Sequence, residues 1–338
     1  MKSTMRAVTV LMAGILAGWI GHSFYLARQA SRLDNIYMEN RRASLELPFI
    51  NPLLECEMGE SVMLKPLQTA KQDVAALIEG WKQDDTSLSV AVYYRNLNDG
   101  PTFGINEKER FLPGSLLKVP TLMGFLKEVE QNPGILRKVV RNELDERALP
   151  FQSIAPQERL VRGRSYTIEQ LLGRMIRYSD NGATSLLNER GGLRMMERVY
   201  SDLGLSREEV ITIKQYTSFF RMLYNASYLD KKYSNYALSL LAQSEFKAGL
   251  AAGLPSSVTI AHKFGEQAYR TDLATEKYDW AQLHDCGIIY YPQNPYLLCV
   301  MTRGKRLEHL APVIADISKL VYKNVDRQMR ATGHFIEH

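Results

Sequence analysis

The chain has 338 residues, enough for one large domain or two small ones, and 45% hydrophobic with 23% charged residues is ordinary for a globular protein. Its net charge of +5 is too small to require a nucleic acid partner, and no basic stripe interleaved with aromatic residues is present. Three cysteines exclude a disulfide-rich scaffold, and none has metal-ligand spacing. We therefore expect no nucleic acid binding and no metal site.

An uncharged apolar segment occupies residues 7–26. About 20 such residues are needed to cross a bilayer, whereas a buried globular helix rarely runs so long without charge. Lys2 and Arg6 precede the segment, and no small-residue cleavage site or lipobox cysteine follows it. We expect an uncleaved single-pass anchor in the cell membrane. Arginines after the segment oppose the positive-inside rule, but long domains cross largely regardless of charge, so we place the remaining chain on the extracytoplasmic side.

The first half of the chain continues with a spacer and the start of a folded domain. Residues 28–65 are charged and then contain prolines without sustained periodicity, which is typical of a stalk. Apolar spacing predicts a helix over residues 67–81. A β-rich run over residues 88–94, closed by turn-forming residues 96–100, predicts a hairpin after that helix.

The second half of the chain has a helical middle, which is followed by strands and a final helix. The pattern is mainly helical over residues 114–250, strands are predicted at 258–263, 286–291 and 296–301, and a helix over 309–322 closes the domain. Strands at both ends with helices between them predict an α+β fold, an antiparallel sheet flanked by helices with an inserted helical lobe. The expected divisions are an anchor at 1–27, a spacer at 28–65, the main domain at 66–325 with its helical lobe at about 116–255, and a tail at 326–338.

Two cysteines flank the last predicted hairpin. Cys286 and Cys299 would lie near one another across two strands joined at residues 292–295. A disulfide and two buried free thiols both fit this placement, because disulfide geometry is strict. Cys56 is left unpaired in either case.

A serine and a lysine stand one helical turn apart after a proline and a glycine. Ser115 and Lys118 follow Pro113-Gly114 at the expected start of a helix and share one face. A desolvated lysine with a lowered pKa can take the proton of the serine hydroxyl and make it a nucleophile. The same spacing recurs at Ser244 and Lys247, so this motif alone does not choose between them.

Two further elements favour Ser115. Ser179-Asp180-Asn181 lies downstream, and Lys263-Phe264-Gly265 follows at the end of a predicted strand. In this order, the three elements resemble those of class A β-lactamases and the related penicillin-binding D,D-peptidases, over about residues 67–322. The stretches around Ser115 and Ser179 resemble the family as well, whereas Ser244 has no such partners.

The resemblance implies a role for each matched residue. Ser115 would attack the carbonyl carbon, Lys118 would act as base, and Ser179 would relay the proton to the leaving nitrogen. Asn181 would hydrogen-bond the amide of the substrate side chain. Lys263 would supply positive charge for the substrate carboxylate and tune the Ser179 hydroxyl.

The resemblance also implies how the oxyanion is bound. The N–H groups of Ser115 and Glu266 would form the oxyanion hole, and Gly265 would be a substrate-binding position of the third element. Asp180 would be structural and hold its loop. No cofactor is implied, since acyl transfer of this kind needs only side chains and water.

The sequence departs from the family pattern at two places. Phe264 stands where the family usually has a hydroxyl residue that binds the substrate carboxylate, so one contact should be missing; Arg270 would either compensate or be a surface residue. No glutamate matches the one that activates the deacylating water in class A β-lactamases. Glu208 and Glu209 are the nearest candidates, and they resemble surface acids.

Two functions follow as hypotheses. The first is a membrane-anchored serine hydrolase that forms an acyl-enzyme at Ser115 with a β-lactam or a peptidoglycan-type peptide amide, and that deacylates slowly for want of a dedicated base. The alternative is a catalytically silent envelope module that binds a peptide or a protein on the same fold. The retained base beside a serine favours the first, because a binding module has no need of it.

Overall fold

The structure is a computed structural model and describes residues 48–51, 65–145, 149, 152, 154, 156, 158–269 and 279–331. The chain divides into two units, Met1–Pro48 and Phe49–His338, and the described helices and strands belong to the second. The expected anchor at residues 7–26 lies outside the described residues, as do Cys56 and Arg270. None of the helices in the described part combines the length and the apolar character needed to cross a membrane.

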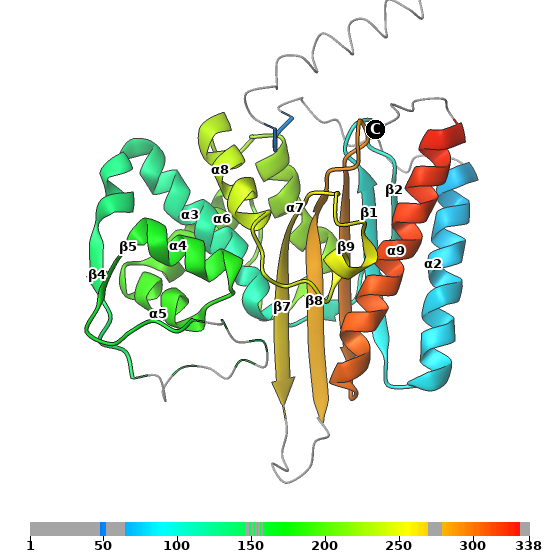
Figure 1. Cartoon of the computed structure of the whole chain (residues 1–338), viewed down its shortest axis with the longest axis horizontal. Helices are drawn as coiled ribbons and strands as arrows, with labels where there is room; N and C mark the ends of the chain where they lie inside the picture. Colours follow the sequence, from blue (N-terminus) through cyan, green and yellow to red (C-terminus); the bar gives the residue numbers. More distant parts are fainter. Residues whose placement is uncertain are drawn as a thin grey trace, which may run out of the picture. The chain divides into compact units, whose positions relative to one another are not determined.

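A five-stranded antiparallel sheet forms the centre of the second unit, in the order β2-β1-β9-β8-β7 (Figure 1). Two strands come from the start of the domain and three from its end, which confirms the α+β prediction. The central strands are buried along nearly their whole length, and the strand Ser89–Asn96 is rich in β-branched and aromatic residues. The strands are β1 Ser89–Asn96, β2 Thr102–Ile105, β7 Ile260–Tyr269, β8 Trp280–Ile289 and β9 Tyr296–Gly304.

Two long helices, α2 (Lys65–Asp84) and α9 (Leu307–Ala331), pack side by side against the sheet (Figure 1). Their apolar faces meet sheet residues in one buried core. Both predicted helices are confirmed and are longer than expected. The helix α9 continues to Ala331, so the expected tail at 326–338 begins inside it; buried Val325 continues the apolar face beyond residue 322, the expected end of the helix.

The helical lobe follows β2 and ends before β7 (Figure 1). Capping boxes begin α4 and α7, in which Thr167 pairs with Gln170 and Thr212 with Gln215. The lobe contains η1 Gly114–Leu117, α3 Lys118–Gln131, η2 Pro133–Arg137, α4 Ile168–Arg177, α5 Asn181–Glu189, α6 Gly192–Asp202, α7 Ile213–Tyr224, α8 Lys231–Leu241 and η4 Leu250–Gly253. Two short strand pairs accompany it, β3 Arg110–Phe111 with β6 Ile211–Thr212 and β4 Val139–Arg141 with β5 Ser165–Thr167.

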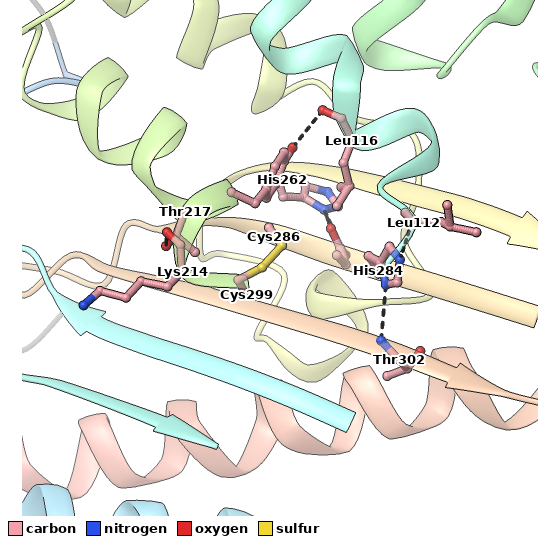
Figure 2. The surroundings of a disulfide bond; sticks show 11 residues. Leu112, Leu116, Lys214, Thr217, His262, His284, Cys286, Cys299 and Thr302 are labelled. Carbon is pink, nitrogen blue, oxygen red and sulfur yellow. Dashed lines mark hydrogen bonds and ion pairs between the residues drawn. A yellow bond between two sulfur atoms is a disulfide. The ribbon is translucent and has the colours of Figure 1, made fainter. Parts of the chain in front are cut away.

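A disulfide joins the two central C-terminal strands. The register of β8 and β9 places Cys286 opposite Cys299, and their sulfur atoms are bonded across a sequence separation of 13. Figure 2 shows the bond beside Lys214 and Thr217 of α7. Both cysteines are fully buried. Of the two arrangements that the sequence left open, the structure has the disulfide.

The edge strand β7 corrects one sequence prediction. Lys263, Phe264 and Gly265 were expected at the end of a strand, but β7 continues to Tyr269 because it pairs with β8 along its whole length. The polar residues after Gly265 hide this continuation in the sequence, since they are partly exposed at the edge of the sheet.

Candidate active site

The segment leading to Ser115 is fixed to strand β8. The backbone N–H of Leu112 donates to the side chain of Gln282 at 3.1 Å, and its carbonyl accepts from His284 Nε2 at 3.0 Å. The Thr302 N–H donates to His284 Nδ1, so Nε2 carries the ring hydrogen. Burial lowers the pKa of His284 to about 4, which keeps the ring neutral. Both backbone polar groups of Leu112, just before Ser115, are therefore hydrogen-bonded to side chains of β8.

Two glycines let the turn that carries Ser115 lie directly on β7. A Cβ atom at Gly265 would come within 2.7 Å of the Pro113 carbonyl oxygen, and one at Gly114 within 2.6 Å of the Glu266 carbonyl oxygen. Gly114 also has a positive φ of 52°, which side chains disfavour. The glycine of the third motif is therefore required for close approach of turn and strand.

Lys118 is buried at the centre of the site, with 4% of its surface exposed. Its Nζ donates to the Ser179 carbonyl at 2.6 Å, to the Ser179 hydroxyl at 3.1 Å and to Asn181 Oδ1 at 2.8 Å. Burial lowers its pKa to about 7, against the smaller opposing effect of Asp180 and Glu266. A lysine with this pKa can exchange a proton at neutral pH.

The Ser179 hydroxyl lies between two lysines. It accepts from Lys118 Nζ and, at 2.8 Å, from Lys263 Nζ. A hydroxyl has two acceptor lone pairs and one donor, so its own proton is left to donate elsewhere. Lys263 is fully buried, and this burial holds its pKa well below the ordinary value. Ser179 itself is held at a positive φ of 54°, a conformation that costs a non-glycine residue free energy.

Asp180 holds the loop, as expected. One of its carboxylate oxygens accepts from the Ala183 N–H at the start of α5, and the other accepts from Arg174 Nε at 2.9 Å. These contacts fix Ser179 and Asn181 on either side of it.

A cavity of about 450 Å³ brings together Ser115, Lys118, Asn181 and Glu266. Its remaining lining combines small, polar and apolar side chains from the helical lobe with the exposed part of β7. The lining residues are Gly114, Ser115, Leu117, Lys118, Thr121, Asn181, Thr184, Asn188, Leu193, Met196, Arg207, Glu266, Gln267 and Ala268.

Neither candidate for a deacylating glutamate lines this cavity in the part of the chain that the structure describes. Glu208 forms an ion pair with Arg110, and both side chains are about half exposed. Glu209 is exposed. The residue that this loop contributes to the lining is Arg207, which pairs with Glu197 of α6. The two acids are surface residues.

Sequence reasoning missed two residues that support the site. Gln152 Nε2 donates to the Ser179 carbonyl at 2.9 Å, and the Tyr216 hydroxyl donates to the Leu116 carbonyl at 3.1 Å. Tyr216 has a weak signal in the apolar face of its helix. Gln152 has none, because it lies between β4 and β5, outside any helix or strand, where no periodicity applies.

Comparisons with known proteins agree with this geometry. A family model described as "Beta-lactamase enzyme family" matches residues 69–325. Beta-lactamase SME-1 from Serratia marcescens is 29% identical over 136 residues, a match that spans 40% of this chain and 45% of that protein. The structure of PBP-A shares the fold, with a TM-score of 0.63 and 19% identity over 77% of this chain and 97% of that one. A class A beta-lactamase from Mycobacterium abscessus also has a TM-score of 0.63, with 21% identity over 76% and 99%. The chain belongs to the beta-lactamase enzyme family, whose members are serine hydrolases that act on amide bonds.

Proposed function

We propose that this protein is a membrane-anchored serine hydrolase that forms an acyl-enzyme at Ser115 with a β-lactam or a peptidoglycan-type peptide amide, and that releases the acyl group slowly. The observation that carries the proposal is the Ser179 hydroxyl held between Lys118 and Lys263, beside the cavity that Ser115 lines. A module that only binds a ligand would not need two buried lysines on one hydroxyl.

The chemistry begins with Lys118 in its neutral form, which can donate to only two of the three oxygens around its Nζ and has a lone pair to accept a proton. It accepts the proton of Ser115 as the serine oxygen bonds to the carbonyl carbon of the substrate. The N–H groups of Ser115 and Glu266 stabilise the negative charge that develops on the carbonyl oxygen. The bond from carbon to the leaving nitrogen then breaks, and this nitrogen takes a proton from Ser179, which regains one from Lys118. Asn181 orients the acyl part. The product is a Ser115 ester and an amine, which departs from a peptide substrate and stays attached to the acyl part of an opened β-lactam.

Slow release of the acyl group follows from what surrounds the ester. Hydrolysis needs a water activated by a base, and the loop expected to supply it contributes Arg207 to the described lining in place of a carboxylate. Glu266, the carboxylate that lines the cavity from β7, accepts a hydrogen bond from the Ile154 N–H at 3.1 Å. A guanidinium stays protonated and cannot accept the water's proton. The ester should therefore persist.

Two observations support the choice of substrate and compartment. A variant of PBP-A, similar in fold, was solved as an acyl-enzyme complex with penicillin G. The Cys286–Cys299 disulfide favours an oxidising compartment, which agrees with an anchor at residues 7–26 and a domain on the extracytoplasmic side.

The test is intact-mass spectrometry of the purified full-length chain in detergent with excess penicillin G. We expect a mass increase equal to the intact drug that decays slowly and is absent from Ser115→Ala. Rapid return to the unmodified mass with consumption of the drug would contradict slow deacylation. Intact drug and unmodified protein after long incubation would favour the silent binding module.

A further inference from the structure

The active-site cavity continues along helix α5, away from the reacting residues. Asn181, Thr184 and Asn188 all line it, and their spacing of i, i+3 and i+7 places them on one face of that helix. Seven residues of helix rise about 10 Å. Asn181 is the end of this row that lies beside Lys118, since its side-chain oxygen accepts from Lys118 Nζ. In the proposed reaction Asn181 orients the acyl part, so the row leads away from the bond that breaks on the acyl side.

Helix α6 begins against the far end of this row. A Cβ atom at Gly192 would lie 2.8 Å from the side-chain oxygen of Asn188. Leu193 follows directly and lines the cavity with 47% of its surface exposed. Met196, one turn further along α6, also lines the cavity and is buried. An apolar wall therefore stands at the Asn188 end of the row, and Leu193 is its open part.

The position of Leu193 separates it from the other exposed apolar residues. The large hydrophobic side chains that are exposed in the described part of the chain are Val139, Val161, Leu193 and Tyr269. Single exposed apolar residues are common on protein surfaces. Of these residues, Leu193 is the one that lines the active-site cavity, where a bound substrate would remove it from water. Covering this leucine with an apolar group is favourable, whereas covering it with an unpaired polar group costs free energy.

We propose that Leu193 determines which acyl parts the enzyme accepts, and that the preferred acyl part carries an apolar group about 10 Å beyond the amide at Asn181. This inference rests on the proposed acyl transfer at Ser115. An acyl part of this length lays its apolar end on Leu193 and displaces water from apolar surface on both sides. An acyl part too short to reach Leu193 leaves the leucine in water and gains nothing from it.

The experiment is a competition between two penicillins that differ only in the acyl side chain, acetyl in one and octanoyl in the other. Purified full-length protein in detergent receives both at equal concentration, with the protein in excess, and mass spectrometry follows the loss of each drug. The ratio of the two rates of loss gives the relative rate of acylation, whether the ester persists or is hydrolysed. This ratio also cancels any loss of folded protein, which affects both drugs equally.

The variants change the leucine or a matched residue elsewhere. Leu193→Ser removes the apolar contact, and Leu193→Met keeps it. Val161→Ser is the control, since it removes a comparably exposed apolar side chain that lies outside the described lining of the cavity. The same detergent is used throughout, so partition of the octanoyl drug into micelles affects every variant equally.

Leu193→Ser should lower the ratio of octanoyl to acetyl acylation by about threefold to tenfold, because the end of the long chain loses its apolar partner. Leu193→Met and Val161→Ser should keep the wild-type ratio. A ratio that Leu193→Ser leaves unchanged, or that Val161→Ser lowers as much, overturns this inference, while loss of drug that depends on Ser115 upholds the proposed function. Loss of both drugs no faster than in Ser115→Ala overturns the proposed function as well.

Discussion

At the scale of single residues, the site depends on taking two lysines out of water. Each loses solvation on burial, and both satisfy part of their hydrogen-bonding capacity on one serine. The free energy of holding these amines in the interior comes from the surrounding fold. The pKa of Lys118, lowered to about 7, makes proton transfer feasible near neutral pH.

The pH dependence of acylation should report Lys118. Its pKa is lowered to about 7, and only the neutral amine can accept the Ser115 proton, so acylation should rise as pH increases. The rate should increase about tenfold from one unit below that pKa to one unit above it. Stopped-flow measurement of acylation by penicillin G checks this. Lys118→Arg, which keeps its proton, should stay inactive throughout; a flat wild-type profile over this range would contradict the assignment.

The strained backbone of Ser179 can be separated from its hydroxyl. Ser179→Ala and Ser179→Gly both remove the hydroxyl, so both should lose acylation by about 100-fold or more. Only glycine relieves the positive φ, so the glycine variant should be more stable than the alanine variant by about 1 kcal/mol. Urea denaturation of the two measures this difference. Equal stability of the two variants would contradict the strain argument, and near-wild-type acylation by them would contradict the role of Ser179 as proton relay.

The sequence predicted which residues to look at but not all of their contacts. Motif order brought together Ser115, Lys118, Ser179 and Lys263, whose types and spacing carry the chemistry. The supporting role of Gln152 could not be predicted, since Gln152 contacts Ser179 from outside any helix or strand. The catalytic roles of the four motif residues stay predictions.

At the scale of elements, the site is a junction between the η1 turn and the edge strand β7. Neither element is unusual alone. Their approach is closer than any side chain at Gly265 would permit, because Pro113 and Leu116 fill that space.

Gly265→Ala should therefore separate turn and strand. A Cβ atom there meets the Pro113 carbonyl and the Leu116 side chain, so the turn must shift and acylation should fall with a stability loss of about 1–3 kcal/mol. Gly173→Ala is the control, because a Cβ at this α4 position meets nothing within 4 Å. It should stabilise the protein by about 0.5–1 kcal/mol and leave acylation intact. Thermal denaturation and acylation by penicillin G test both variants. Full activity in Gly265→Ala would show that the close approach is dispensable.

Sequence patterns predicted the existence of these elements better than their ends. Apolar periodicity indicated α2, α9 and the main strands. It ended β7 too early, because residues after Gly265 face solvent at the sheet edge and lose the buried pattern while keeping their pairing with β8.

At the scale of the whole molecule, the sheet is assembled from strands at both ends of the domain, and the Cys286–Cys299 bond cross-links two of them. The sequence predicted the α+β architecture because strands flank a helical middle. It left the disulfide open, since pairing depends on a register that spacing alone does not define. The anchor at residues 7–26 stays a prediction.

The disulfide should contribute to stability and be visible by thiol titration. Three cysteines less the two bonded ones leave one free thiol, so the denatured protein should titrate one thiol before reduction and three after it. Cys299→Ala should lower stability by about 2–4 kcal/mol, because the bond restricts the unfolded chain, and Cys56→Ala should have little effect. Three thiols without reduction would contradict the pairing.

The central claim, that Ser115 is the nucleophile, is tested most directly by locating the acyl group. The full-length wild type and Ser115→Ala are each incubated with excess penicillin G, quenched in acid, digested and mapped by mass spectrometry. We predict one acylated peptide, modified at Ser115 and present only in the wild type. Acylation at another residue such as Ser244, or the absence of any acylated peptide, would contradict the claim.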